Sequence, residues 1–212
     1  MNKTFCIGLH KQGTSSLADF ADINGLKSIH STNWQNQPSL LNEYDFFSDG
    51  GSHYDGINEF EFENLSTLFE NSKFILQTRD PEKWIISKLV HAGWNLKTTF
   101  SEGDTTQQPE HSGWKEKTLL NIKRFLTHKK NYEAKVKKYF ESSEGLSNRL
   151  LTIDVTAGSN ESNSLVLARF LGINDANYKP IPWSNKVASK GSAIKLPMEV
   201  HEYISKLICD LF

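Results

Sequence analysis

The sequence from Lys3 to Leu17, KTFCIGLHKQGTSSL, sets the expected fold of this 212-residue chain. A short apolar run at 5–7 enters a loop bounded by Gly8 and Gly13, and apolar residues recur at helical spacing from Leu17 onward. The pattern predicts a strand, a glycine loop and a helix. This arrangement directs backbone N–H groups and a helix N-terminus toward one place, where they can bind an anion.

The two glycines have the spacing of the phosphate-binding motif GxxxxGK[ST], but Thr14 stands where the motif has its lysine. The lysine of this loop is Lys11 instead. We therefore expect a site for a phosphate-type anion and no ordinary ATP hydrolysis. For the three hydroxyl residues, simple capping of the helix is the alternative. The expected binding residues are Gly8, Lys11, Gln12, Gly13, Thr14, Ser15 and Ser16.

The composition, 37% apolar and 23% charged with a net charge of −1, is typical of a globular protein and favours neither nucleic acid nor an acidic membrane as partner. No apolar run approaches the roughly 18 residues of a membrane span, and the apolar run near the N-terminus is too short for a signal peptide. We expect one cytoplasmic domain over 1–212, with Cys6 and Cys209 as buried free thiols.

Strands predicted near 5–7, 26–30, 44–47, 73–78 and 149–154 alternate with helical patterns. Such alternation predicts the α/β class, here a P-loop-type parallel sheet flanked by helices on both faces. Two polar segments interrupt it: a glycine-rich loop at 48–56 and a lid or insertion at 93–113. Ligands of parallel sheets bind at the carboxyl ends of the strands. The loop 8–14, Arg79 and Asp154 are all expected there.

Arg79 directly follows the strand predicted at 73–78, and Ser87 lies about two turns into the helix that begins at Pro81. Both side chains could reach one second phosphate, for which the planar, multi-donor guanidinium is well suited. The alternative is that Arg79 pairs with Asp80 or caps a neighbouring helix.

These segments resemble a known family. Lys11-Gln12-Gly13-Thr14-Ser15 resembles the 5′-phosphosulfate loop of sulfotransferases that use 3′-phosphoadenosine 5′-phosphosulfate (PAPS). Arg79-Asp80-Pro81 with Ser87 resembles the 3′-phosphate motif of the same family. The segments 150–154 and 167–172 resemble the late strand and helix of small sulfotransferase-like proteins, so the resemblance covers most of Lys3–Gly172.

The resemblance implies transfer of a sulfuryl group from PAPS to a hydroxyl or amine of a small-molecule or glycan acceptor, with adenosine 3′,5′-bisphosphate as product and no metal. Lys11 would stabilise the leaving oxygen, and the hydroxyls at 14–16 would hold the 5′-phosphate. Arg79 and Ser87 would bind the 3′-phosphate. Lys190 and Gly191 would form a counterpart of the late basic loop that closes on the 3′-phosphate in this family.

The base that removes the acceptor proton is predicted in the glycine-rich loop. His53 is favoured narrowly over Asp49, because imidazole accepts protons near neutral pH whereas a carboxylate needs a raised pKa. Glu43 and Asp55 are further candidates, and His30 at a strand end is the least favoured.

Two other functions fit the same motifs. One is a P-loop kinase acting on a nucleoside or small metabolite, and the other is a non-catalytic nucleotide-binding protein on a decayed sulfotransferase fold. The segment 31–72, with eight acidic residues and no Lys or Arg, is either a solvated surface or the border of a pocket for a neutral or amine-bearing acceptor.

Overall fold

The computed structural model describes residues 3–32, 34, 37–50, 52–54, 57–59, 62–91, 114–157, 160–182 and 198–212. Two compact units divide the chain. The first comprises Met1–Arg79 and Tyr132–Asn185, and the second comprises Asp80–Asn131 and Lys186–Phe212. The first unit contains a five-stranded sheet, and the second is built from helices. One domain over 1–212 stays a prediction.

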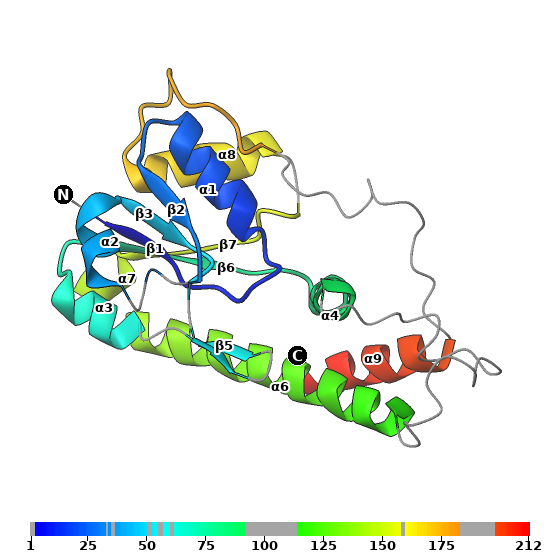
Figure 1. Cartoon of the computed structure of the whole chain (residues 1–212). Coiled ribbons are helices and arrows are strands. Elements are labelled where there is room, and N and C mark those ends of the chain that lie inside the picture. The colour runs from blue at the N-terminus through cyan, green and yellow to red at the C-terminus, as the bar shows by residue number, and fades with distance from the viewer. Residues whose placement is uncertain are drawn as a thin grey trace. The chain divides into compact units, whose positions relative to one another are not determined.

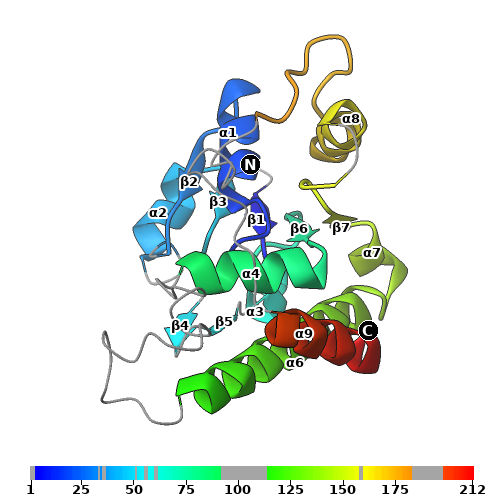
Figure 2. The same ribbon diagram turned by 90° about the vertical axis from the view of Figure 1, so that its right-hand side faces the viewer.

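The sheet of the first unit is entirely parallel, with the strand order β2-β3-β1-β6-β7 (Figure 2). β1 is central, and Phe5 pairs with Phe47 on one side and with Phe74 on the other. The α/β class and the parallel sheet predicted from the sequence are therefore confirmed. The strands are β1 Thr4–Cys6, β2 Ser28–His30, β3 Phe46–Ser48, β6 Lys73–Gln77 and β7 Leu150–Ile153.

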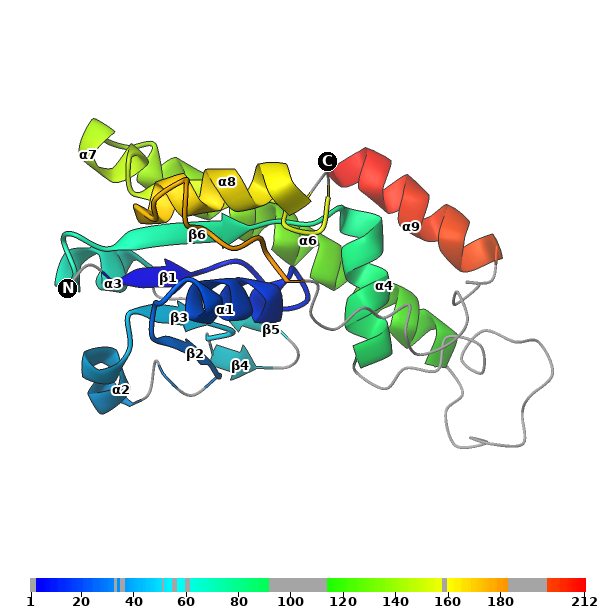
Figure 3. The ribbon, with the colours of Figure 1, turned by 90° about the horizontal axis from the view of Figure 1, so that it is seen from above.

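Helices cover both faces of this sheet (Figures 1 and 3). α1 (Thr14–Ile23) and α8 (Asn160–Leu171) lie on one face, and α3 (Phe62–Leu68) and the end of α6 (Trp114–Phe140), from Tyr132 onward, lie on the other. Successive residues of a strand point to opposite faces. Cys6 accordingly packs with the residues of α1 and α8, whereas Phe5 packs in an aromatic layer with the rings of Trp34, Phe47, Phe69 and Phe74.

The glycine-rich stretch at 48–56 is not one continuous loop. Residues Ser52–Tyr54 (β4) pair antiparallel with Ile57–Glu59 (β5), and α3 begins at Phe62. The sequence carries a signal for this hairpin, because Asp55-Gly56 is typical of a two-residue turn between strands. The remaining helices of the first unit are α2 (Pro38–Glu43) and α7 (Glu144–Ser147).

The second unit contains α4 (Pro81–His91), the first part of α6 and α9 (Met198–Leu211). α4 begins as its sequence predicts, because Asp80 Oδ1 accepts a hydrogen bond from Lys83 N at 2.9 Å and Pro81 occupies the first turn. α9 contacts α4, and Tyr203 of α9 donates from Oη to the carbonyl oxygen of Leu119 on α6. No described helix is both long and apolar enough to cross a membrane.

The two cysteines differ. Cys6 is fully buried as expected, and burial raises the pKa of its thiol well above the usual value. The expectation for Cys209 is wrong, since this thiol is exposed. The buried stripe of α9 follows Val200, Ile204 and Leu207, and position 209 falls outside it. The predicted lid at 93–113 lies outside the described residues.

Candidate functional site

Gly8 anchors the β1–α1 loop to the neighbouring strand. Gly8 N donates to Gln77 Oε1 at 2.9 Å, and Gln77 Nε2 donates back to the carbonyl oxygen of Gly8 at 3.1 Å. Gln77 is fully buried at the end of β6. A Cβ atom on Gly8 would lie 2.2 Å from the backbone oxygen of Gln77, so only glycine fits. Gly8 therefore sets the start of the loop through contacts with β6.

Residues with left-handed backbone conformation alternate with other residues along the loop. Lys11 has φ 68° and Gly13 has φ 90°, whereas Gln12 and Thr14 are not in the left-handed region. Alternation of this kind turns successive N–H groups toward one side and forms an anion-binding concavity. Gly13 is the N-cap of α1 and has no side chain with which to cap the helix. Thr14, Ser15 and Ser16 lie within the first turn of α1, and their capping of the helix stays the alternative to binding an anion.

α6 supports the same loop from the other face of the sheet. Tyr132 Oη donates to the carbonyl oxygen of Ile7 at 2.6 Å, and Gln12 Nε2 donates to Glu133 Oε1 at 3.0 Å. Gln12 is fully buried, and its Oε1 has no hydrogen-bond partner among the described residues. With its side chain enclosed, Gln12 can offer a ligand only its backbone groups.

Arg79 joins the two sequence motifs directly. Its Nη1 donates to the carbonyl oxygen of Lys11 at 2.9 Å, across 68 residues of sequence. β6, which ends just before Arg79, is the immediate neighbour of β1 in the sheet, and this pairing brings the two motifs together. Asp80, which lies in the second unit, caps α4.

Lys11 is half-buried between opposite charges. Burial lowers the pKa of its ammonium below the usual value of 10.5, the carboxylate of Asp49 acts to raise it, and the guanidinium of Arg79 acts to lower it further. Two cations close enough to repel each other are suited to a bound anion, which relieves that repulsion.

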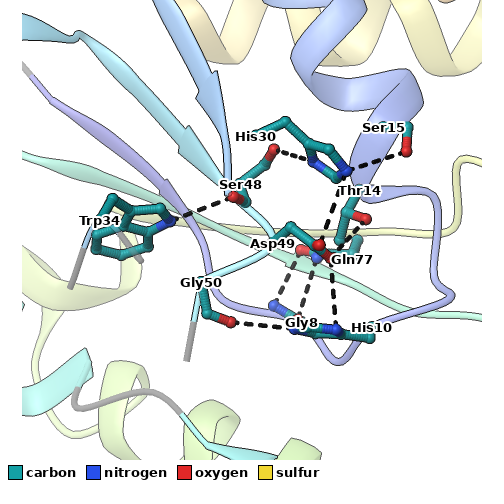
Figure 4. A network of polar contacts seen from close by, with 10 residues as sticks. All are labelled: Gly8, His10, Thr14, Ser15, His30, Trp34, Ser48, Asp49, Gly50 and Gln77. Atoms are coloured by element: carbon teal, nitrogen blue, oxygen red, sulfur yellow. Dashed lines mark hydrogen bonds and ion pairs between the residues drawn. The ribbon is translucent and has the colours of Figure 1, made fainter. Parts of the chain in front are cut away.

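Asp49 brings a carboxylate to the loop from the end of β3 (Figure 4). Thr14 Oγ1 donates to Asp49 Oδ1 at 3.1 Å. His10 Nδ1 lies 3.6 Å from the same oxygen, and His30 Nε2 lies 3.8 Å from Oδ2. Asp49 therefore lies between two imidazoles, at the N-terminus of α1.

His30 connects this carboxylate to the strand ends (Figure 4). Its Nε2 lies 3.2 Å from Ser15 Oγ, and its Nδ1 lies 2.9 Å from Ser48 Oγ. Trp34 is fully buried, and its Nε1 donates to the carbonyl oxygen of Ser48 at 3.2 Å. Sequence analysis made His30 the least favoured candidate for the base. Its place at the end of β2 nevertheless indicated a position near the site, because the carboxyl ends of adjacent parallel strands share one edge of the sheet.

Lys11 and Asp49 are alone among the described non-glycine residues in having positive φ, at 68° and 60°. This region disfavours residues with a β-carbon, and such strained residues concentrate at functional sites. Lys11 lies within the β1–α1 loop, and Asp49 contacts the end of this loop through Thr14.

No protein-family model matches the chain, and no curated protein matches it. The likeness to sulfotransferases therefore depends on the residues themselves.

The other predicted site residues have different positions. His53 lies on β4, but its side chain is outside the described residues, as are Asp55, Lys190 and Gly191. Ser87 lies on α4 in the second unit, so a joint 3′-phosphate site with Arg79 stays a prediction. Ser16 lies in the first turn of α1.

Two features lie at the opposite edge of the sheet. Glu43 is exposed at the end of α2, before β3 begins, which disfavours it as the base at this loop. A shallow hollow lined by Lys3 and residues 67–72 also precedes β1 and β6. Neither borders the β1–α1 loop.

Proposed function

We propose that the chain binds PAPS at the β1–α1 loop and transfers its sulfuryl group to a hydroxyl or amine of a small-molecule or glycan acceptor. The observation that carries this proposal is the position of Lys11. It lies in a loop where left-handed residues alternate with others, its carbonyl oxygen accepts a hydrogen bond from Arg79, and the N-cap of the helix that follows is Gly13. The charges of Asp49 and Arg79 both act on the pKa of its ammonium.

The loop supplies the binding step. Its alternating backbone suits the non-bridging oxygens of a phosphosulfate, and the positive end of the α1 dipole favours the same negative charge. Thr14, Ser15 and Ser16 add hydroxyls or backbone N–H groups in the first turn. This is a P-loop-type arrangement in which the cation comes from within the loop.

Lys11 supplies the transfer step. The acceptor oxygen or nitrogen attacks sulfur, a new bond to sulfur forms, and the bond from sulfur to the 5′-phosphate oxygen breaks. That oxygen leaves with the electron pair as part of adenosine 3′,5′-bisphosphate. A cation placed where this charge develops stabilises the transition state more than the ground state. The acceptor proton must pass to a base.

We assign Asp49 as that base, in preference to His53. Its carboxylate is within electrostatic range of Lys11 and is held by the Thr14 hydroxyl. His10 and His30 flank its two oxygens.

Calorimetry with adenosine 3′,5′-bisphosphate and with ATP tests the proposal. We expect the bisphosphate to bind at least about tenfold more tightly, a difference of about 1.4 kcal/mol. Equal or tighter binding of ATP would contradict the proposal and favour the kinase. Incubation with PAPS and a panel of hydroxyl and amine acceptors then separates an enzyme from a binding protein. Binding of the bisphosphate without release of product on any acceptor would favour the non-catalytic alternative.

A further inference from the structure

We propose that His30 is a positioning residue for Asp49, whose carboxylate it holds against the first turn of α1. The carrying observation is that one imidazole ring lies against three groups, the hydroxyls of Ser48 and Ser15 and the carboxylate of Asp49 (Figure 4). The inference rests on the proposed function, which makes Asp49 the base, and adds the group that orients this base. All four residues belong to the first unit.

The Nδ1 edge of the ring is fixed by the sheet. His30 is the last residue of β2 and pairs in register with Ser48, the last residue of β3. Nδ1 lies 2.9 Å from Ser48 Oγ, and Ser48 is fully buried. The carbonyl oxygen of Ser48 also accepts hydrogen bonds from Trp34 Nε1 and Ser31 N, both at 3.2 Å. The ring is therefore attached to a firmly held residue that directly precedes Asp49.

The Nε2 edge of the ring faces Asp49 and α1. Nε2 lies 3.2 Å from Ser15 Oγ and 3.8 Å from Asp49 Oδ2. An ionised carboxylate can only accept hydrogen bonds, whereas a hydroxyl can donate as well as accept. We therefore assign the ring hydrogen of neutral His30 to Nε2, with Nδ1 accepting from the Ser48 hydroxyl. In this tautomer the N–H group lies on the edge of the ring that faces Ser15 and the carboxylate.

Both oxygens of the Asp49 carboxylate are then held at the start of α1. Thr14 Oγ1 donates to Oδ1 at 3.1 Å, and His30 Nε2 attracts Oδ2 on the side of Ser15, the next residue of the helix. The φ of Asp49, 60°, is unfavourable and must be maintained by its surroundings. A bound phosphosulfate would repel the carboxylate, because the two charges have the same sign. His30 opposes this displacement and keeps the base in place while the donor is bound.

Three substitutions separate the two edges of the ring. In His30→Gln the amide nitrogen can take the place of Nε2, in His30→Asn it can take the place of Nδ1, and His30→Ala removes both. A positioning role predicts a kcat about 30-fold lower in His30→Ala and His30→Asn but within about threefold of wild type in His30→Gln, because a misplaced base slows transfer. Affinity for adenosine 3′,5′-bisphosphate, measured by calorimetry, should stay within about threefold in all three variants.

The ranking of the two amide variants decides the inference even if His30→Ala does not fold. An active His30→Asn with an inactive His30→Gln would show that His30 only supports Ser48, and would overturn the inference. Equal turnover in the two amide variants, or a loss of bisphosphate affinity as large as the loss of kcat, would overturn it as well. Wild-type protein that transfers a sulfuryl group to no acceptor would overturn the proposed function, and the inference with it.

A double-mutant cycle tests whether His30 acts through Asp49. In an Asp49→Asn background, His30→Asn should lower kcat by less than about threefold, because the group that it positions is already lost. A loss as large as in the wild-type background would contradict the inference. His201→Gln, at an exposed histidine that lies 3.5 Å from Glu82 Oε1, is the matched control.

Discussion

Lys11 and Asp49 are both held at positive φ, although each carries a β-carbon that disfavours this conformation. They come from different strand ends, one after β1 and one after β3, and their charges act on each other. A protein that needed only a folded loop could place glycine at both positions. At the scale of single residues, we therefore interpret Lys11 and Asp49 as catalytic residues.

Removal of either charge should stop transfer and spare nucleotide binding. We expect Lys11→Ala and Asp49→Asn each to lower kcat by about 100-fold, because one stabilises the leaving oxygen and the other accepts the proton. Bisphosphate affinity should fall by less than about tenfold, since the loop backbone remains. Lys138→Ala, at an exposed position of α6, is the control. Turnover that survives in Lys11→Ala would remove Lys11 from the mechanism.

At the scale of elements, the loop owes its shape to its neighbours. β6 holds Gly8 and Lys11 through Gln77 and Arg79, and α6 holds Ile7 and Gln12 through Tyr132 and Glu133. These contacts hold the loop backbone in the conformation that carries Lys11. The position after Gly13, where the usual motif has its lysine, is Thr14 in this chain.

Gly8→Ala tests how strictly β6 sets the start of the loop. The new Cβ would meet the Gln77 backbone oxygen at 2.2 Å, so β1 and β6 must separate, at a cost of about 3 kcal/mol in the free energy of unfolding. Gly25→Ala is the matched control. Gly25 has φ 85° and open space around it, so the substitution should cost only about 1 kcal/mol. Urea denaturation measures both, and equal losses would show that β1 and β6 adjust freely.

At the scale of the whole molecule, the burial of Lys11 links stability to pH. Its pKa is lowered in the folded protein, chiefly by burial and further by Arg79, against the opposing effect of Asp49. Between that lowered pKa and the usual 10.5, the unfolded chain binds more protons than the folded one, so this group makes stability rise with pH. Below the window the folded protein bears the full cost of the buried charge.

Lys11→Met measures this cost, since it keeps the length of the side chain and removes the ammonium. The variant should gain stability relative to wild type at pH 7, and this gain should shrink as the pH rises toward 10.5. Chemical denaturation of both proteins across this range gives the difference. Lys138→Met provides the comparison for an exposed lysine. A gain that grows with pH would contradict the assigned direction.

Much of the fold was predictable from local pattern. The strand at 73–78 and the helix that starts at Pro81 were readable because apolar periodicity and Pro81 act on neighbouring residues. The hairpin of β4 and β5 was missed although Asp55-Gly56 is typical of its turn, because each strand has only three residues, too few to show a period of two. The contacts of His30 were not predictable for a different reason. They depend on which strands are adjacent, and strand order is not a local property.

The sequence by itself determined the alternation of strands and helices, the glycine loop and the presence of Lys11 within it. Only the tertiary structure decided which groups from other strands meet at that loop. Arg79, Asp49 and His30 come from three other strand ends, and they reach the loop because parallel pairing of β2, β3, β1 and β6 aligns those ends at one edge. Helical and strand periodicity depend on near neighbours, whereas the meeting of these charges depends on long-range packing.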